Sequence, residues 1–513
     1  MIKTSNQTGM VLAGLLLSIL MASMDNTIVA TAMGSIIGDL GGLDKFVWVT
    51  SAYMVAEMAG MPIFGKLSDM YGRKRFFVFG IIVFMLGSAL CGTATSIVQL
   101  SIYRAIQGIG GGALVPIAFT IMFDVVKPES RGKLMGMFGA VFGMSSIFGP
   151  LLGAYITDYI QWEWIFYINL PLGLIAFLMI ASFYKESHQH AKQRIDWAGA
   201  LTLVGAIVCL MFALELGGKT YAWGSTTIIS LFTGFALLAV GFIYAETKAE
   251  EPIISFRMFR SRLYAASNSI AMLSGAAFIL ASVYIPIYIQ GVLGGSATNS
   301  GLVLLPMMLG TVVTATAGGF LISKYSYRAI LIATLIMLVA GIALLTTLTP
   351  SSSRLLITTY MILVGLGIGA SFSVLSNAAI HSVSANQRGA ASSTLNFLRS
   401  LGMTISITLF GIIQSHSLTR HLTDSFTSSG QLALPQGLDF NDPHALLDPV
   451  TRSQIPEQVL SQITESLSSS IVTTFALGII PAVLALTAAL AMSREKFVVV
   501  VEEEANDSFV VSH

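Results

Sequence analysis

The sequence predicts an all-α polytopic membrane protein. Of its 513 residues, 54% are hydrophobic and only 10% are charged, whereas a soluble protein carries about 25% charged residues. Apolar stretches of about 20 residues recur, and each is long enough to cross a hydrocarbon core about 30 Å thick. We expect fourteen transmembrane helices, at residues 10–33, 46–64, 76–96, 100–123, 134–156, 164–183, 197–217, 226–246, 265–290, 299–321, 328–348, 355–378, 391–414 and 470–492.

Lysine and arginine residues collect on one side of these spans. Of the 27 in the chain, most precede the first span, follow the last span or lie in loops after even-numbered spans; Lys45 and Arg354 are among the few on the other side. Because cytoplasmic loops carry the excess of positive charge, we expect both termini in the cytoplasm and the protein in the cell membrane. The first span, at 10–33, is too long for a cleavable signal and is interpreted as retained.

A weak internal repeat divides the chain into two related bundles. Residues 108–113 (GIGGGA) match 365–370 (GLGIGA) at an offset of 257, and 126–132 (VKPESRG) match 383–389 (VSANQRG) at the same offset. Parallel repeats of this kind occur in secondary transporters. We expect an N-terminal six-span bundle at 1–183, a linker with two extra spans at 184–263, a C-terminal six-span bundle at 264–492 with an outer loop at 415–469, and a cytoplasmic tail at 493–513.

Three ionisable residues, Asp25, Glu57 and Arg104, lie inside predicted spans of the first half. Each costs about 2.5–3.5 kcal/mol on membrane insertion, so each needs a role. Arg104 shares a helical face with Gly108 and Gly111, and small residues mark the face that packs against another helix. Arg104 should therefore point into the bundle. Two interpretations stay open: a static buried ion pair of Arg104 with either acid, or an acid that takes up and releases protons.

The segment GKLSDMYGRKR, which begins at Gly65, is a charged hairpin between the second and third predicted spans. Gly65 and Gly72 allow backbones to approach closely at its two ends. Asp69, Arg73 and Lys74 keep it out of the lipid, and its positive charge predicts the cytoplasmic side. This run closely resembles the loop between the second and third spans of the major facilitator superfamily, a family of secondary transporters.

Further motifs resemble one branch of that superfamily. Residues 143–153 (GMSSIFGPLLG) are similar to the glycine-rich fifth-span motif of its antiporters, with Ala154 where a second terminal glycine is usual. MDNTIVATA around Asp25, RAIQGIGGG from Arg104 and WEWIFYINLPLG at 162–173 resemble the first-, fourth- and sixth-span motifs. In this order the motifs resemble the fourteen-span drug:proton antiporters of the EmrB/QacA type.

The resemblance implies a fold of two six-helix bundles with two extra central spans, and it implies roles for particular residues. Asp25 and Arg104 would take part in proton coupling or cation binding. Glu57 is added to them because of its position in the second span. The gating hairpin would comprise Gly65, Asp69, Gly72, Arg73 and Lys74, and the antiporter motif of the fifth span Gly149, Pro150 and Gly153.

These features predict a proton-coupled antiporter that exports amphipathic, cationic organic compounds. Its expected partners are protons, small molecules and the lipid bilayer, and its expected state is a monomer. Aromatic faces attract cations, so Phe278, Tyr284 and Tyr288 are candidate substrate contacts, although helix packing explains them equally well. Two alternatives stay open: an exporter or flippase of a native lipid or metabolite, and a non-transporting membrane sensor. The mid-span Asp25 counts against a sensor.

Other classes of function are disfavoured. The stretch GMPIFGKL at 60–67 nearly matches an ATP-binding P-loop, but Leu67 stands where Ser or Thr must bind Mg²⁺. The sequence has no C-x-x-C, H-E-x-x-H or G-x-S-x-G motif, so we expect no enzyme activity, no cofactor and no metal. A net charge of +1 argues against nucleic-acid binding.

Overall fold

The computed structural model describes residues 5–41, 47–126, 128–186, 195–218, 220–295, 297–381, 383–384, 387–429 and 456–496. Within these ranges the regular structure is helical, apart from one isolated bridge between Gly217 and Tyr221. The all-α prediction is therefore confirmed for the described part of the chain.

Long helices follow one another in the order that the apolar stretches predict. They are α1 (Ser5–Leu40), α2 (Val47–Tyr71), α3 (Arg73–Cys91), α4 (Ile97–Val125), α5 (Pro128–Tyr159), α7 (Asn169–Phe183), α8 (Trp197–Leu216), α9 (Thr226–Lys248), α10 (Arg262–Ile287), α11 (Ala297–Leu321), α12 (Tyr327–Leu345), α13 (Arg354–His381), α14 (Arg388–Ser429) and α16 (Glu457–Ala491). Short pieces complete the order: α6 (Trp164–Tyr167) before α7, a 3₁₀ turn (Met258–Arg260) before α10, and a π turn (Tyr288–Val292) after it.

Several of these helices begin at a polar cap that the sequence supplies. In each case the side chain of the cap accepts a hydrogen bond from the backbone N–H three residues later, which satisfies a donor that the first turn leaves unpaired. The caps are Ser96 for α4, Asp196 for α8, Ser225 for α9, Ser261 for α10 and Ser326 for α12.

Within the described residues, twelve helices are long and apolar enough to cross a membrane. Of the long helices, α2 and α5 fall outside this set. Helix α2 carries Glu57, Lys66 and Asp69, which make it more polar, and the apolar described stretch of α5 is only Phe148–Thr157. The prediction of fourteen spans is therefore not supported by this count, although the second and fifth predicted spans are helical.

The predicted outer loop at 415–469 is shorter in the structure. Helix α14 continues to Ser429 and α16 begins at Glu457, so both ends of the segment are helical. Hydropathy marks the part of a helix that lies in lipid, whereas the helical backbone bonds itself internally and continues into water. Residues 430–455 of the loop and 497–513 of the predicted tail lie outside the described residues.

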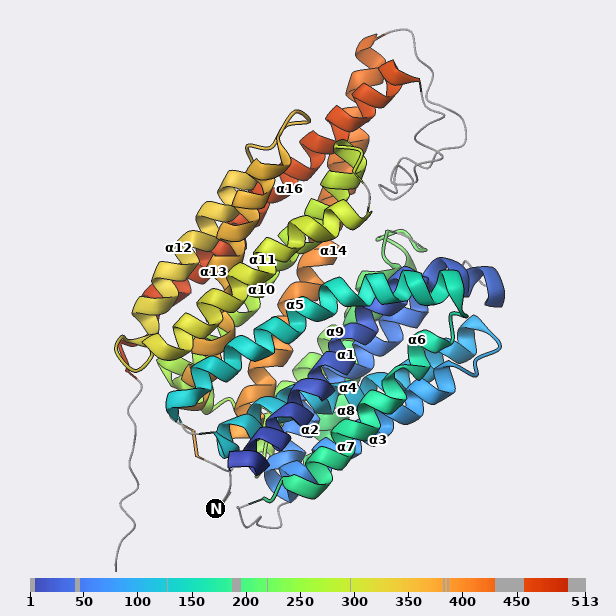
Figure 1. The fold of residues 1–513 in the computed structure, drawn as a ribbon. Coiled ribbons are helices and arrows are strands. Elements are labelled where there is room, and N and C mark those ends of the chain that lie inside the picture. The colour runs from blue at the N-terminus through green and yellow to red at the C-terminus, as the bar shows by residue number, and fades with distance from the viewer. Residues whose placement is uncertain are drawn as a thin grey trace, which may run out of the picture.

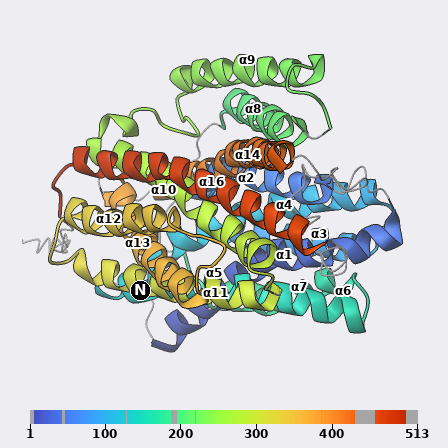
Figure 2. The same ribbon diagram turned by 90° about the horizontal axis from the view of Figure 1, so that it is seen from above.

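The helices form two bundles with a helical pair at their edge. Helices α1 to α7 make up one bundle and α10 to α16 the other, and between the bundles α5 contacts α11 and α2 contacts α14 (Figure 1). The inserted helices α8 and α9 lie side by side, with α8 against α2 and α14 and α9 outermost, as Figure 2 shows. In Figure 1 the two bundles come together near the end where the chain begins and diverge toward the outer ends of α14 and α16.

The same close helix crossings recur in both bundles. Gly110 of α4 lies against the backbone nitrogen of Phe84 in α3, and Gly367 of α13 lies against that of Leu338 in α12; a Cβ at either glycine would overlap its partner. Small residues let membrane helices approach in this way. The sequence repeat is thus also a repeat of packing. Two more pairs of equivalent glycines show the same repeat. Gly108 lies against the Tyr53 carbonyl, and its equivalent Gly365 lies against the Met307 carbonyl. Gly112 lies against the Glu57 carbonyl, and its equivalent Gly369 lies against the Thr311 carbonyl.

We expect Gly110→Leu and Gly367→Leu each to lower the midpoint of thermal unfolding of the purified protein. Overpacking of a close contact costs about 1–3 kcal/mol. Gly34→Leu is the matched control, because a Cβ at Gly34 in α1 would meet nothing within 4 Å. Unchanged midpoints in both α4 and α13 variants would contradict the crossings.

Candidate functional site

A buried ion pair joins α1 to α4. Arg104 Nη1 contacts Asp25 Oδ2, and both side chains are fully buried. The sequence leaves open whether Asp25 or Glu57 faces Arg104, and the structure brings Asp25 to it. Taking two charges out of water costs several kcal/mol per ion, which the pair and its hydrogen bonds must offset.

Amide and hydroxyl groups complete the surroundings of Asp25. Its Oδ1 accepts hydrogen bonds from Gln107 Nε2 at 2.8 Å and Asn169 Nδ2 at 2.9 Å. The same two amide nitrogens donate to Ser88 Oγ at 2.8 and 2.9 Å. Because these partners come from α3, α4 and α7, the polar cluster links four helices of the first bundle.

Arg104 also lies over an aromatic ring. Its Cζ is 4.2 Å from the centroid of the Tyr53 ring in α2, an attractive cation–π contact. Its Nε donates to Val49 O at 3.3 Å. Gly111 of α4 leaves room for the Tyr53 hydroxyl, since a Cβ there would lie 2.7 Å from it. The predicted inward direction of Arg104 therefore agrees with its contacts.

Glu57 lies one turn after Tyr53 on the face of α2 that packs against α4. A Cβ at Gly112 would lie 2.6 Å from Glu57 O, and one at Gly111 would lie 3.8 Å from Glu57 Cγ. Unlike Asp25, Glu57 is partly exposed, and within the described part of the chain its carboxylate has no hydrogen bond or ion pair. Of the two acids inside predicted spans, Asp25 therefore has its carboxylate fully bonded, and Glu57 has a carboxylate without a partner among the described residues.

The hairpin between α2 and α3 turns at Gly72, whose φ of 113° lies in the region that favours glycine. Arg73 forms ion pairs with Asp69, at 3.2 Å between Nη2 and Oδ1, and with Asp124 at the end of α4. Lys74 Nζ donates to a backbone carbonyl of α7 at 2.6 Å. The hairpin is therefore tied to the ends of α4 and α7 in its own bundle.

Asp69 also reaches the other bundle. Its Oδ1 and Oδ2 accept hydrogen bonds from the backbone N–H groups of Gly389 at 2.9 Å and Ala390 at 2.8 Å, in the first turn of α14. A carboxylate at this position complements the positive end of the helix. A Cβ at Gly389 would lie 2.6 Å from Asp69 Oδ1, and one at Gly65 would overlap Ser393. Glycine at both positions permits the contact.

The Asp69 carboxyl lies outside the predicted span at 46–64 and the candidate membrane spans. Burial raises its pKa to about 6, while Arg73 and the two backbone N–H groups lower it. Because the raised pKa means that the buried site holds the proton more tightly than an exposed carboxyl does, protonation favours the closed contact. The link between the bundles should therefore be stronger at acidic pH and weaken as the pH rises through about 6.

The fifth-span motif places α5 against α1. A Cβ at Gly149 would overlap Thr27 Oγ1, and one at Gly153 would overlap Thr31 Oγ1. Thr27 Oγ1 donates to a backbone carbonyl of α5 at 3.0 Å. Pro150 lies between the two glycines inside the helix. The close neighbour of this motif is thus the helix that carries the buried acid.

Phe278, Tyr284 and Tyr288 are buried in the second bundle. Tyr284 packs edge-on against Phe475 of α16, with ring centroids 6.5 Å apart, and Tyr288 OH accepts a hydrogen bond from Ser468 Oγ at 3.4 Å. These contacts favour the interpretation as helix packing. A role in contacting substrate stays a prediction for all three residues.

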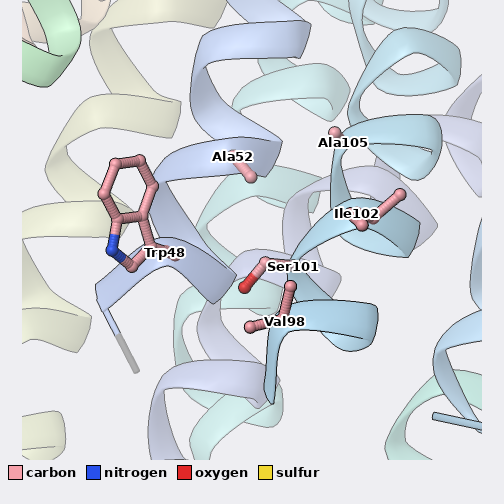
Figure 3. Close-up of a pocket in the computed structure, with 6 residues that line it drawn as sticks. All are labelled: Trp48, Ala52, Val98, Ser101, Ile102 and Ala105. Carbon is pink, nitrogen blue, oxygen red and sulfur yellow. The ribbon is translucent and has the colours of Figure 1, made fainter. Parts of the chain in front are cut away.

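A recess lies between α2 and α4 (Figure 3). Its volume is about 420 Å³ and its lining is almost entirely apolar: Trp48, Ala52, Val98, Ser101, Ile102 and Ala105. Val98 and Ile102 are more than half exposed, so the recess faces the outside of the bundle. None of the predicted site residues lines it. Over the described ranges, no three His, Cys, Asp or Glu side chains gather as a metal site requires.

Several residues that make buried polar contacts are not among the site residues predicted from the sequence. Gln107, Asn169 and Ser88 carry no distinctive signal, because amides and hydroxyls are common in helices. Gly389 ends the second copy of the repeated segment VSANQRG, and that repeat is the signal that marks it. Arg399 stands inside a predicted span, where its charge alone is a signal.

Comparison with known proteins assigns the family. The family model of the Major Facilitator Superfamily matches residues 15–407, and the chain belongs to this superfamily. It is 53% identical over 490 residues to Multidrug resistance protein 3 of Bacillus subtilis (strain 168), covering 95% of this chain and 96% of that protein. It is 36% identical over 482 residues to Multidrug transporter protein MdtP of the same organism, covering 91% and 89%.

A solved structure shows the same fold. The human organic anion transporter MFSD10 (TETRAN) is similar with a TM-score of 0.60 and 16% sequence identity, over 93% of this chain and 99% of that chain. The chain is thus a multi-pass membrane protein of a superfamily of small-molecule transporters. The resemblance seen in the sequence is confirmed for the superfamily, and its fourteen-span branch remains a prediction.

We expect removal of the Asp69 carboxylate to loosen the contact between the hairpin and α14. In a protein whose two native cysteines are replaced by alanine, a cysteine at the buried Ser393 should react slowly with a soluble maleimide. Asp69→Ala should raise that rate about tenfold or more, because hydrogen bonds to a charged group contribute about 1.5–3 kcal/mol.

The control for this labelling is Asp39→Ala. Asp39 accepts a hydrogen bond from Trp162 Nε1 at 2.9 Å, within the first bundle, so its loss should leave the rate at Ser393→Cys unchanged. Equal rates with and without Asp69 would show that the contact does not hold the bundles together.

Proposed function

We propose that the protein is a proton-coupled antiporter that exports amphipathic, cationic organic compounds. One observation carries the proposal: Asp25 is buried and surrounded by donors, while Glu57 is partly exposed and, among the described residues, without a partner. The names of the two Bacillus subtilis relatives, a multidrug resistance protein and a multidrug transporter, support transport of several compounds.

Glu57 is the group that exchanges a proton for a substrate in this proposal. A carboxylate inside a membrane protein needs a counter-charge, and either a proton or a substrate cation supplies it. A proton that enters from outside releases the substrate, and a substrate that enters from the cytoplasm releases the proton. Asp25 neutralises Arg104, which would otherwise repel a cation from the neighbouring Glu57.

A single exchanging carboxyl has an energetic consequence. One proton moving inward for one monovalent cation moving outward transfers no net charge, so the pH gradient drives export. A second coupled proton would add about 2.3 kcal/mol for each 100 mV of membrane potential. That contribution corresponds to roughly a fiftyfold larger concentration ratio, because about 1.4 kcal/mol equals a factor of ten.

We infer that both termini are cytoplasmic and that α2 and α5 also cross the membrane. These two helices pack against neighbouring helices of their own bundle and against the other bundle, and the loops on the hairpin side carry most of the lysine and arginine. The chain then has fourteen spans, which agrees with an EmrB/QacA-type exporter. Its units are the bundles at 1–183 and 264–492 and the linker at 184–263.

In this orientation the hairpin acts as the cytoplasmic gate. The contact of Asp69 with α14 holds the cytoplasmic ends together, while Gly65 and Gly72 permit the approach and the turn. Arg73 and Lys74 anchor the hairpin to its own bundle. Release of Asp69 lets the bundles separate on the cytoplasmic side. The glycines of the fifth-span motif keep α5 close to α1 through this change.

We expect Glu57→Gln to abolish ethidium transport driven by a pH gradient in proteoliposomes, without lowering the midpoint of thermal unfolding. Gln cannot exchange a proton, but within the described part of the chain the Glu57 carboxylate makes no hydrogen bond or ion pair that the change would break. Asp25→Asn should instead lower the unfolding midpoint, because an uncompensated buried Arg104 costs about 3–5 kcal/mol. Both quantities are measured on the same purified proteins.

Glu457→Gln, at the exposed start of α16, is the matched control and should transport ethidium at the native rate. Undiminished transport by Glu57→Gln would remove Glu57 from the mechanism. Native stability of Asp25→Asn would show that the ion pair is not structural.

A further inference from the structure

The second bundle holds a buried arginine that the proposed exchange does not use. Arg399 of α14 is 6% exposed. Its Nη1 donates to Asn396 Oδ1 at 3.3 Å and its Nη2 to Ser371 O at 3.2 Å. Across the described ranges, no carboxylate lies within 4.0 Å of this guanidinium. Both hydrogen-bond acceptors are neutral, so the positive charge is not compensated.

The arginine of the first bundle has an acidic counter-ion, and the arginine of the second bundle has none among the described residues. Each bundle has an arginine over an aromatic ring: Arg104 over Tyr53, and Arg399 over Phe372 with 4.6 Å between Cζ and the ring centroid. Arg104 has Asp25 as its counter-ion. Charged side chains inside a membrane protein normally pair with one another, and an exception marks a functional site. Arg399 is such an exception.

Two buried hydroxyl groups on helices that contact α14 also lack partners among the described residues. Ser371 and Ser274 are buried, and the described structure gives the Oγ of neither one a hydrogen bond. The Ser371 carbonyl bonds the guanidinium, and Ser274 precedes Gly275, where a Cβ would lie 3.1 Å from Arg399 Cγ. Buried hydroxyls are usually bonded. An arginine that has no counter-ion among the described residues, with unbonded hydroxyls on the adjoining helices, suits an anionic group.

We propose that Arg399 binds the carboxylate of amphipathic substrates that carry a negative as well as a positive charge. A guanidinium matches a carboxylate through two parallel hydrogen bonds. The site lies where α10, α13 and α14 meet, and the partly exposed Phe372 covers it. The aromatic ring offers an apolar surface for the body of the same molecule.

Arg399 and Glu57 lie on two helices that are in contact with each other. Helices α2 and α14 pack against each other, and Thr404 Oγ1 of α14 contacts Met58 Sδ, next to Glu57, at 3.7 Å. A zwitterion would place its cation at Glu57 and its carboxylate at Arg399. This inference rests on the transport function proposed above, and it extends the substrate class from cations to zwitterions.

A pair of dyes tests the site. Rhodamine 110 has a free carboxylate, and rhodamine 123 is its methyl ester with the same cationic ring system. Binding to the full chain in phosphatidylcholine nanodiscs, which hold no anionic headgroup, is followed by fluorescence anisotropy. The native protein should bind rhodamine 110 more tightly. Arg399→Gln should weaken rhodamine 110 binding about tenfold or more and leave rhodamine 123 binding within about twofold.

Two further variants keep the test decisive. Arg399→Lys retains the charge and should retain part of the preference for rhodamine 110. Ser371→Ala removes only an unpartnered hydroxyl and should weaken rhodamine 110 alone, even if Arg399→Gln does not fold. Equal weakening of both dyes, or no rhodamine 110 binding by the native protein, overturns the proposal. If the native protein does not bind rhodamine 123, that result counts against cation export and not against the Arg399 site. Rhodamine 110 binding that depends on Arg399 supports the site whether or not rhodamine 123 binds.

Discussion

The constraint on which this structure depends is that a charge inside a membrane protein needs a partner. Asp25 and Arg104 satisfy it together, and the amides of Gln107 and Asn169 satisfy the remaining lone pairs of the carboxylate. Arg104 and Gln107 come from α4 and Asn169 from α7, so these contacts with Asp25 fix how α1, α4 and α7 sit in the first bundle. Among the described residues Glu57 has no hydrogen-bond or ion-pair partner for its carboxylate, and we propose it as the acid that exchanges partners.

The two bundles share a scaffold and differ in chemistry. Glycines 257 residues apart in α4 and α13 allow the same close crossings. At the crossing where the first bundle has Glu57, the second has Thr311, and the second bundle carries Arg399 instead of an acid. Close crossings need small residues at fixed positions, whereas the charged positions are free to diverge. In our proposal the first bundle then offers the negative Glu57 to a substrate, and the second bundle offers the positive Arg399.

Much of the architecture is predictable from the sequence because hydropathy, glycine spacing and charge act locally. These signals give the helices, the repeat, the hairpin at Gly65 and the inward direction of Arg104. The partner of Arg104 was not predictable, since it depends on how α1 and α2 are rotated relative to α4. The partner of Asp69 lies 320 residues away, and nothing in the sequence near Asp69 indicates it. The span count differs because α2 holds polar residues that hydropathy penalises and because the apolar described stretch of α5 is only Phe148–Thr157.

The central claim is that Glu57, and not Asp25, gives up a proton when a cationic substrate binds. Infrared difference spectroscopy of the purified protein measures this directly, because only a protonated carboxyl shows the carbonyl band of a carboxylic acid. Addition of ethidium should remove such a band from the native protein and from Asp25→Asn, and it should have no such effect in Glu57→Gln. Loss of the band in Glu57→Gln, with no loss in Asp25→Asn, would contradict the account.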